Sequence, residues 1–182
     1  MDLRTFSNLP NLITFGRLLL VPVVIALIVA GEFKAAAIAF VVAGVSDGLD
    51  GWIAKTFDLR SELGAYLDPI ADKALLTSIF VALALVGAIP ATLAIIVVAR
   101  DVMIVGAFLI ARLLDRPMQV RPLLVSKLNT LAQIVFAALA LCVEAFGLSK
   151  EGWFTASAYA VAGLALASLA AYAAQWIRHM NA

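Results

Sequence analysis

Residues 47–73 read DGLDGWIAKTFDLRSELGAYLDPIADK and place four aspartates within a largely apolar sequence. Asp47 and Asp50 are three positions apart, and Asp68 and Asp72 are four apart. On an α-helix, either spacing puts the two side chains on one face, one turn from each other. Four carboxylates in or near a membrane need a countercharge, because burying even one without compensation is costly. Divalent cations with oxygen ligands are the natural candidates.

The composition indicates an integral membrane protein. Of the 182 residues, 64% are hydrophobic and 14% are charged, whereas soluble domains are about half apolar and a quarter charged. The single cysteine, Cys142, excludes an intrachain disulfide and lies in an apolar run typical of a packed thiol. The sequence contains no zinc-ligand spacing, P-loop or dinucleotide fingerprint. We expect no nucleic-acid partner.

The apolar runs predict an all-α integral membrane protein with six transmembrane helices. A membrane helix needs about 20 predominantly apolar residues, and each run approaches or exceeds that length. The first run contains Arg17 and is expected to be a retained membrane helix rather than a cleaved signal. A short amphipathic segment, residues 1–9, precedes it. We expect a single membrane domain over residues 1–182, with spans at about 10–30, 33–55, 63–86, 90–111, 128–146 and 153–177.

The distribution of basic residues predicts that both termini are cytoplasmic. Of the 13 lysines and arginines, Lys73 and Arg100 lie inside predicted spans, and only Lys34 and Lys150 lie on the side away from the termini. The others share the side of the termini, which the positive-inside rule makes cytoplasmic. They are Arg4, Arg17, Lys55, Arg60, Arg112, Arg116, Arg121, Lys127 and Arg178.

This topology brings the four aspartates to the cytoplasmic side, where the second span ends and the third begins. Two divalent metals about 3.5–4 Å apart can hold both the attacking and the leaving oxygen of a displacement at phosphorus. Gly48 and Gly51 leave room for a ligand, and Lys55 and Arg17 could balance substrate phosphate charge. The stretch predicts phosphoryl transfer to or from a lipid substrate. Intramembrane acids also mark ion pathways, so an ion transporter is the alternative.

Structural roles compete for several charged residues outside the four aspartates. Lys73 stands beside Asp72, and Arg100 beside Asp101. Each pair is explained equally well as a local charge pair within a buried helix. The basic residues of the loop 112–127 could serve only to set the orientation of the helices in the membrane. For these residues the sequence does not decide between a structural and a functional role.

The residues from Asp47 to Asp72 resemble the signature of the CDP-alcohol phosphatidyltransferase family. The matching pattern is Asp47-x-x-Asp50-Gly51-x-x-Ala54-Lys55, eight residues, Gly64, three residues, Asp68, three residues and Asp72. The family usually has arginine where this chain has Lys55. Lysine keeps the charge but loses the bidentate fork of arginine, so the contact with a CDP group is expected to differ.

The resemblance implies a role for each matching residue. Asp47, Asp50 and Asp68 would bind one divalent cation, Mg²⁺ or Mn²⁺, and Asp47, Asp68 and Asp72 a second. Asp72 would also be the base that takes the proton of the acceptor hydroxyl. The implied reaction joins an alcohol to the phosphatidyl group of CDP-diacylglycerol and releases CMP. The implied contacts with the CDP-lipid are Asn11, Arg17, Gly51, Lys55 and Ser61.

Sequence outside the signature bears on the acceptor alcohol. The stretches ARDVMIVGAFLIAR (99–112) and RPLLVSKLNT (121–130) resemble the cardiolipin synthase branch, whose acceptor is phosphatidylglycerol. In the phosphatidylglycerophosphate synthase branch, which uses glycerol 3-phosphate, we would expect a second lysine at Asn129. A phosphomonoester carries nearly two charges, so fewer cations suit a phosphodiester better. The expected acceptor contacts are Arg121, Lys127 and Asn129.

The resemblance also implies a homodimer among membrane lipids. We expect a multi-pass protein of a bacterial-type inner membrane with its active site on the cytoplasmic side, the mitochondrial inner membrane being the alternative. A non-catalytic lipid-binding member is disfavoured, because all four signature aspartates are present.

Overall fold

The computed structural model describes residues 9–56, 62–113 and 123–180 of the chain. These residues form six α-helices and no strand, which confirms the all-helical prediction. The helices are α2 Leu9–Val29, α3 Phe33–Thr56, α4 Glu62–Leu85, α5 Ala91–Leu113, α6 Leu124–Phe146 and α7 Gly152–Met180. Residues 1–8, which hold most of the predicted amphipathic segment, lie outside the described residues.

Helix α6 begins at Leu124, earlier than the start predicted at residue 128. The basic residues Arg121 and Lys127 flank its first apolar side chains, so the sequence reads as a polar loop there. The backbone of Leu123 is still extended, with φ −71° and ψ 141°. Lys127 therefore lies within the first turns of a helix, not at the end of a loop, and Asn129 follows it on the same helix.

Glycines end the helices at the short turns. At the end of α6, Gly147 adopts the left-handed conformation with φ 61°, which costs glycine little because it has no Cβ. The N–H of Leu148 then donates to the carbonyl of Val143 at 3.0 Å. This bond closes the last turn of α6 and sends the chain back along the bundle.

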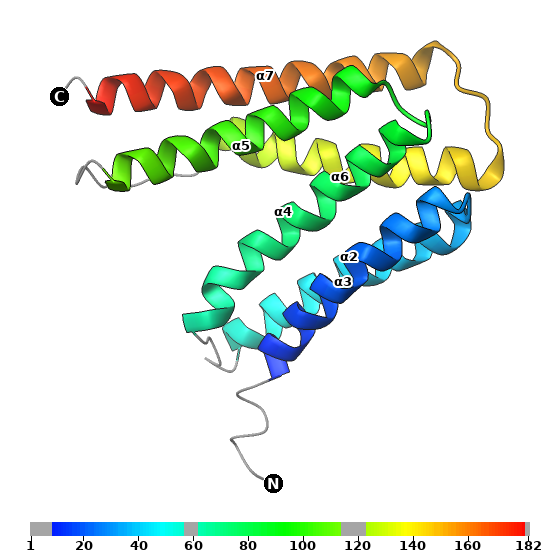
Figure 1. Cartoon of the computed structure of the whole chain (residues 1–182), viewed down its shortest axis with the longest axis horizontal. Helices are drawn as coiled ribbons and strands as arrows, with labels where there is room; N and C mark the ends of the chain where they lie inside the picture. Colours follow the sequence, from blue (N-terminus) through cyan, green and yellow to red (C-terminus); the bar gives the residue numbers. More distant parts are fainter. Residues whose placement is uncertain (1–8, 57–61, 114–122, 181–182) are drawn as a thin grey trace, which may run out of the picture.

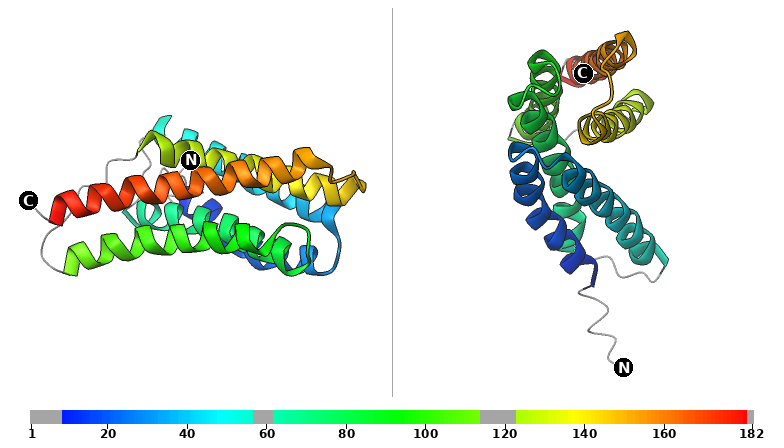
Figure 2. Two further views of the ribbon diagram at one scale, coloured as in Figure 1. Left: turned by 90° about the horizontal axis from the view of Figure 1, so that it is seen from above. Right: turned by 90° about the vertical axis from the view of Figure 1, so that its right-hand side faces the viewer.

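The three short turns described, at residues 30–32, 86–90 and 147–151, lie at one end of the bundle, which we call the turn end (Figure 1). At the opposite end, α3 ends and α2, α4 and α6 begin; we call this the aspartate end. Helix α2 packs against α3 and α4, while α7 packs against α5 and α6. The side-by-side course of α5 and α7 is visible in both views of Figure 2. Helix α6 contacts α3 and α4 and so joins the two groups.

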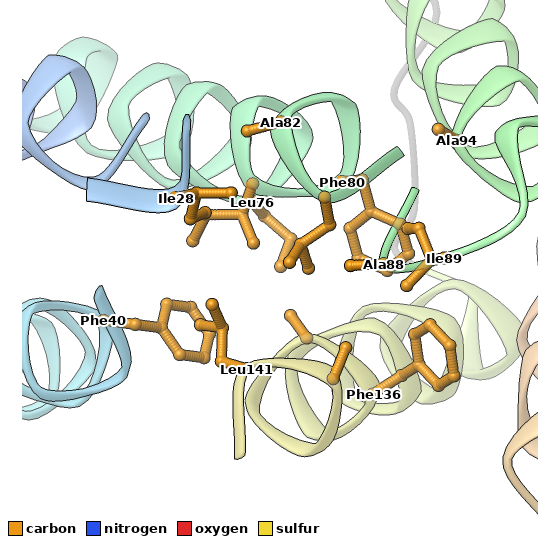
Figure 3. Packing of buried hydrophobic residues seen from close by; sticks show 14 of the residues in the cluster. Ile28, Phe40, Leu76, Phe80, Ala82, Ala88, Ile89, Ala94, Phe136 and Leu141 are labelled. Atoms are coloured by element: carbon orange, nitrogen blue, oxygen red, sulfur yellow. The ribbon is translucent and has the colours of Figure 1, made fainter. Parts of the chain in front are cut away.

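The apolar core lies between these helices on the turn-end side of α4 and α6 (Figure 3). Phe80 of α4 and Phe136 of α6 are both buried, with ring centroids 6.0 Å apart and planes at 29°. Phe136 also meets Phe154 of α7 at 5.4 Å. Since an aromatic pair adds about 0.5–1.5 kcal/mol beyond its burial, these rings fix α4, α6 and α7 relative to one another.

Large apolar side chains also cover the outside of the bundle. Two helical segments, Leu124–Phe146 and Gly152–Arg178, are long and apolar enough to cross a membrane. Shorter apolar segments occur at Leu18–Val29, Phe33–Ser46 and Lys73–Leu85. Exposed side chains such as Ile38, Ile95, Val102, Leu131 and Tyr159 point away from the core. An apolar exterior of this extent is typical of a surface in contact with lipid.

Candidate active site

The two aspartate pairs lie on two helices at the aspartate end. Asp47 and Asp50 are in the second half of α3, and Asp68 and Asp72 are in the first half of α4. Within each helix the two positions are about one turn apart, as their spacing predicts. The end of α3 and the beginning of α4 lie near one another in Figure 1. The fold therefore carries both pairs toward the same end of the molecule.

The residues predicted to contact a CDP-lipid belong to the same end, with one exception. Asn11 and Arg17 are in the first half of α2, which packs against α3 and α4. Gly51 and Lys55 follow the first aspartate pair along α3. Ser61 lies outside the described residues. Three helices thus bring their predicted nucleotide residues and aspartates to one end of the bundle.

The predicted acceptor residues divide between α6 and the loop before it. Arg121 lies outside the described residues. Lys127 is exposed near the beginning of α6, and Asn129 on the same helix is fully buried, with 0% of its surface exposed. The side-chain nitrogen and oxygen of Asn129 are both buried without a hydrogen-bond partner. A lysine at this position would place a positive charge in the interior of the bundle, whereas the asparagine places a neutral amide there.

Gln133, one turn beyond Asn129, was not among the predicted site residues. It is 1% exposed, and its amide nitrogen is also buried without a hydrogen-bond partner. The signal present in the sequence was its spacing of four residues from Asn129 within an apolar span. Buried amides are normally paired, so this place on α6 differs from an ordinary packed core.

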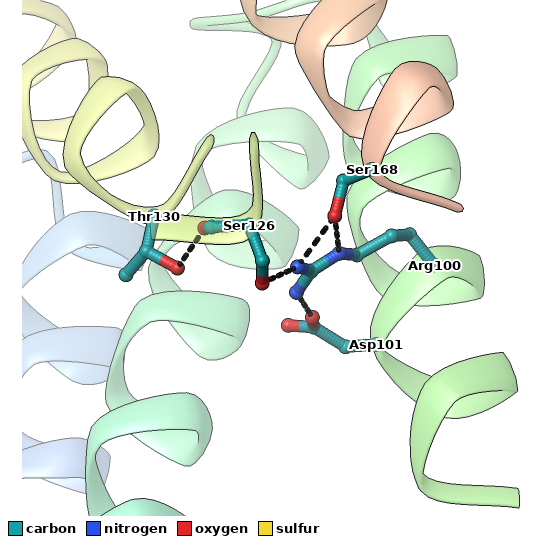
Figure 4. Close-up of polar contacts among 5 residues, drawn as sticks. All are labelled: Arg100, Asp101, Ser126, Thr130 and Ser168. Atoms are coloured by element: carbon teal, nitrogen blue, oxygen red, sulfur yellow. Dashed lines mark hydrogen bonds and ion pairs between the residues drawn. The ribbon is translucent and has the colours of Figure 1, made fainter. Parts of the chain in front are cut away.

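A second polar cluster is centred on Arg100 of α5 (Figure 4). Arg100 is 3% exposed, and its Nη1 pairs with the carboxylate of Asp101. Its Nη2 donates to Ser126 Oγ of α6 at 2.6 Å and to Ser168 Oγ of α7 at 2.9 Å, and its Nε donates to Ser168 Oγ at 3.3 Å. The local pair with Asp101 is present, but two serines from other helices complete the cluster.

The Arg100 cluster joins α5, α6 and α7 through one buried cation. Each guanidinium nitrogen has a partner, and the charge is offset by the neighbouring carboxylate, whose side chain is 13% exposed. A buried cation is tolerated only with such compensation. Because Ser126 stands three residues before Asn129, the cluster also fixes the beginning of α6. The sequence signal for the serine contacts was weak, because Ser168 stands alone in an apolar run.

The donor set suits hard divalent cations. Carboxylate oxygens are the ligands that Mg²⁺ and Mn²⁺ prefer, and four aspartates would balance the charge of two such cations. Among the side chains that the structure describes, no other group of three or more His, Cys, Asp or Glu residues could hold a metal. The chemistry of the residues on α3 and α4 thus fits two divalent cations, although the described side chains do not extend to these aspartates.

A family model described as CDP-alcohol phosphatidyltransferase matches residues 7–174. This range covers most of the chain and contains both aspartate pairs, the Arg100 cluster and the first half of α6. The match extends well beyond the aspartate stretch, which makes up a small part of the matched length.

Curated proteins of two kinds are similar to the chain. It is 38% identical, over 72% of its length, to a fusion of a CMP-forming cardiolipin synthase and a mitochondrial hydrolase from Schizosaccharomyces pombe. It is 33% identical, over 79%, to the human CMP-forming cardiolipin synthase. It is 32% identical, over 92%, to a chloroplastic CDP-diacylglycerol–glycerol-3-phosphate 3-phosphatidyltransferase of rice. The matches span 25%, 53% and 56% of the lengths of these relatives. The chain therefore corresponds to about a quarter of the first relative and to little more than half of the other two.

Proposed function

Because the chain belongs to the CDP-alcohol phosphatidyltransferase family, we propose that it transfers the phosphatidyl group of CDP-diacylglycerol to phosphatidylglycerol, forming cardiolipin and CMP. The transferase assignment rests on the family match together with the signature on α3 and α4, in which only Lys55 departs from the family pattern. The acceptor assignment rests on one observation, the burial of neutral Asn129 where a second lysine would suit a phosphomonoester. Relatives that make cardiolipin support the same branch.

The chemistry we propose is a displacement at phosphorus with the proton passing to Asp72. The acceptor hydroxyl oxygen bonds to the phosphatidyl phosphorus, the bond from that phosphorus to the CMP oxygen breaks, and Asp72 takes the hydroxyl proton. Asp47, Asp50 and Asp68 would hold one divalent cation, and Asp47, Asp68 and Asp72 a second. When bound, the cations supply charge stabilisation at the reacting phosphate.

The substrate contacts follow from the placement of helices at the aspartate end. We assign the CDP group to Asn11 and Arg17 of α2 with Gly51 and Lys55 of α3, and to Ser61. We assign the acceptor phosphodiester to Arg121 and Lys127, whose cations would meet its single negative charge. Asn129 is assigned to the neutral part of the acceptor. In this proposal the CDP-lipid contacts α2 and α3 and the acceptor contacts α6, and α4, which carries Asp72, packs against both α2 and α6.

We further propose that all six helices cross the membrane in one domain, with both termini in the cytoplasm. The excess of basic residues on one side supports this orientation. The aspartate end would then face the cytoplasm, where a CDP-lipid head is accessible. A bacterial-type inner membrane is the proposed location, with the mitochondrial inner membrane as the alternative, and the assembly is a homodimer.

A phosphatidylglycerophosphate synthase is the second candidate, because the rice relative is named for glycerol 3-phosphate and its match covers 92% of this chain. In that case the acceptor would be water-soluble, and Lys127 and Arg121 would share a phosphomonoester. The family match favours either transferase over the ion-transporter alternative.

An acceptor assay separates the candidates. Purified full-length protein is supplied with CDP-diacylglycerol, Mg²⁺ or Mn²⁺, and either phosphatidylglycerol or glycerol 3-phosphate, and both CMP and the lipid product are measured. We expect cardiolipin from phosphatidylglycerol. Product from glycerol 3-phosphate alone would overturn the acceptor assignment, and no CMP release with either acceptor would overturn the proposed reaction.

A further inference from the structure

Helix α6 carries two buried amides that the fold leaves unsatisfied. Asn129 and Gln133 are 0% and 1% exposed, and the buried atoms without partners are Asn129 Nδ2, Asn129 Oδ1 and Gln133 Nε2. At a separation of four residues the two side chains could bond to each other across one turn. They do not, although the donor Gln133 Nε2 and the acceptor Asn129 Oδ1 are both free of other partners.

The amide pair lies at the beginning of the buried face of α6. Asn129, Gln133, Phe136 and Ala140 follow one another at helical spacing along that face, and all are buried. Phe136 stacks on Phe80 of α4 and also meets Phe154 of α7, so this face packs inside the bundle, where α6 contacts α3, α4 and α7. The amides therefore continue the line of the core toward the aspartate end, where polar groups replace apolar ones.

The amide pair lies on the aspartate-end side of the stacked rings, as do the aspartates of α4. Helices α4 and α6 both run from the aspartate end toward the turn end and cross obliquely in Figure 1. Asn129 lies seven residues before Phe136, and Lys73 lies seven residues before its stacking partner Phe80. Seven residues are about 10 Å along either helix. Counted from the stacked rings, Asn129 on α6 and Lys73 on α4 are therefore equally far along their helices toward the aspartate end.

The unpaired atoms define the ligand that would satisfy them. Each amide nitrogen offers two N–H donors, and Asn129 Oδ1 offers an acceptor. A simple anion accepts from the nitrogens but cannot donate to the oxygen. A hydroxyl group does both, because its oxygen accepts from the amide nitrogens while its hydrogen donates to Asn129 Oδ1. Neutral amides also suit an uncharged group, because they leave no buried charge when the site is empty.

We infer that Asn129 and Gln133 recognise the glycerol diol of the acceptor, with Gln133 a specificity-determining residue beside Asn129. The inference rests on the proposed transferase function. The terminal hydroxyl of the diol is the one that Asp72 deprotonates, and the adjacent hydroxyl bonds to the amides. This diol occurs both in the head group of phosphatidylglycerol and in glycerol 3-phosphate. Recognition of it is therefore separate from the choice between those acceptors.

The test compares acceptors that differ by one hydroxyl. Phosphatidylglycerol is measured against phosphatidyl-1,3-propanediol, which keeps the terminal nucleophile and lacks only the middle hydroxyl. We expect the unmodified protein to favour phosphatidylglycerol by about 10- to 100-fold in kcat/KM, the usual range for one hydrogen bond to a buried polar group. If the unmodified protein uses glycerol 3-phosphate instead, the same ratio is measured against 3-hydroxypropyl phosphate.

Asn129→Leu and Gln133→Met remove the amides, but Leu keeps the branching and the number of side-chain heavy atoms of Asn, and Met keeps the chain length of Gln, so the core stays filled. In each variant we expect the ratio between the two acceptors to fall toward one, while the KM for CDP-diacylglycerol stays unchanged. Leu131→Ala is the control, because Leu131 lies on the same helix and is 58% exposed. It should keep the full ratio.

The outcomes distinguish this inference from the proposed function. If the variants lose activity equally with both acceptors and keep the ratio, the amides have a structural role and the inference is wrong. If the unmodified protein does not discriminate between the two acceptors, the inference is also wrong. Activity with glycerol 3-phosphate alone overturns the proposed acceptor. The diol inference is then decided by the ratio of kcat/KM between glycerol 3-phosphate and 3-hydroxypropyl phosphate.

Discussion

The two buried polar clusters that include residues of α6 differ in whether the polar atoms have hydrogen-bond partners within the protein. In the Arg100 cluster every guanidinium nitrogen has a partner, supplied by the adjacent carboxylate and by serines of α6 and α7. In the amide pair, formed by Asn129 and Gln133, three polar atoms have none. The clusters are only a turn apart on α6, since Ser126 belongs to the first and Asn129 to the second.

The difference separates a structural role from a binding role. Removing a polar side chain from a satisfied cluster leaves its partners unpaired and costs stability. Removing one from an unsatisfied pair relieves a penalty that the folded protein already bears. Proteins retain such penalties at binding sites, where a ligand supplies the missing partner. Substitutions in the two clusters should therefore affect stability and activity in opposite ways.

The largest effect is expected on activity, at Asp72. In Asp72→Asn the proposed base is replaced by an amide that cannot take the acceptor proton, so we expect kcat to fall by about 10²- to 10⁴-fold. CMP release is measured with CDP-diacylglycerol and phosphatidylglycerol at saturating metal. The matched control is Asp101→Asn in the Arg100 cluster, which should lose stability but keep its activity per folded molecule. Full activity in Asp72→Asn would exclude Asp72 as the base.

The largest effect on stability is expected at Arg100. In Arg100→Ala the carboxylate of Asp101 stays buried without its cation, and Ser126 and Ser168 lose a shared donor. Breaking a buried pair on one side costs about 3–5 kcal/mol. We expect a loss of this size in the free energy of unfolding, measured by denaturant titration in detergent. Arg100→Lys should lose less, because it keeps the charge but not the geometry of the guanidinium.

A loss below about 1 kcal/mol in Arg100→Ala would contradict the view of this cluster as a connection between three helices. The double variant Arg100→Met, Asp101→Asn provides a further check. It removes both charges together, so it should recover much of the stability that Arg100→Ala loses.

At Asn129 the change in stability should have the opposite sign. Asn129→Leu replaces a fully buried, unpartnered amide by an apolar side chain of similar size. We expect the free energy of unfolding to rise by about 1 kcal/mol, at the lower end of the penalty for an unsatisfied buried group. The same variant should turn over phosphatidylglycerol more slowly. A variant that is both less stable and fully active would remove the distinction between the two clusters.

Periodicity and composition predict the helices well but side-chain partnerships poorly. Long apolar runs and turn glycines such as Gly147 are local signals, so the all-helical architecture could be predicted. The start of α6 could not, because Arg121 and Lys127 conceal the apolar residues between them. Ser168 contacts Arg100 across 68 positions of sequence, and no local pattern encodes such a contact.

The candidate site divides in the same way. The place of the aspartate pairs on two helices could be predicted from their local spacing, and their proposed function from the signature that they complete. Asn129 is a candidate because the phosphatidylglycerophosphate synthase branch is expected to have a second lysine at this position. Gln133 was missed, because an isolated glutamine in an apolar span is informative only once its burial and lack of a partner are known.

The smallest effect is expected at the turn end, where Lys150 provides a reference outside both clusters. Lys150 pairs with Glu144, donates to the carbonyl of Ala88 at 2.8 Å and lies 5.6 Å from the ring centroid of Phe154. Its side chain is 35% exposed, so water already screens the pair. Lys150→Ala should therefore lower the free energy of unfolding by about 0.2–1 kcal/mol, as exposed ion pairs do.

The kcat/KM of Lys150→Ala for phosphatidylglycerol should be unchanged, because Lys150 is in the loop at the turn end, opposite the aspartate end. Unfolding and CMP release are measured on the same preparation. If the loss of a polar contact far from the aspartates altered turnover, turnover would respond to substitutions anywhere in the fold. A loss of activity in Asn129→Leu could then not be assigned to the acceptor site. If the kcat/KM of Lys150→Ala is unchanged, a loss of activity in Asn129→Leu can be assigned to the removed amide.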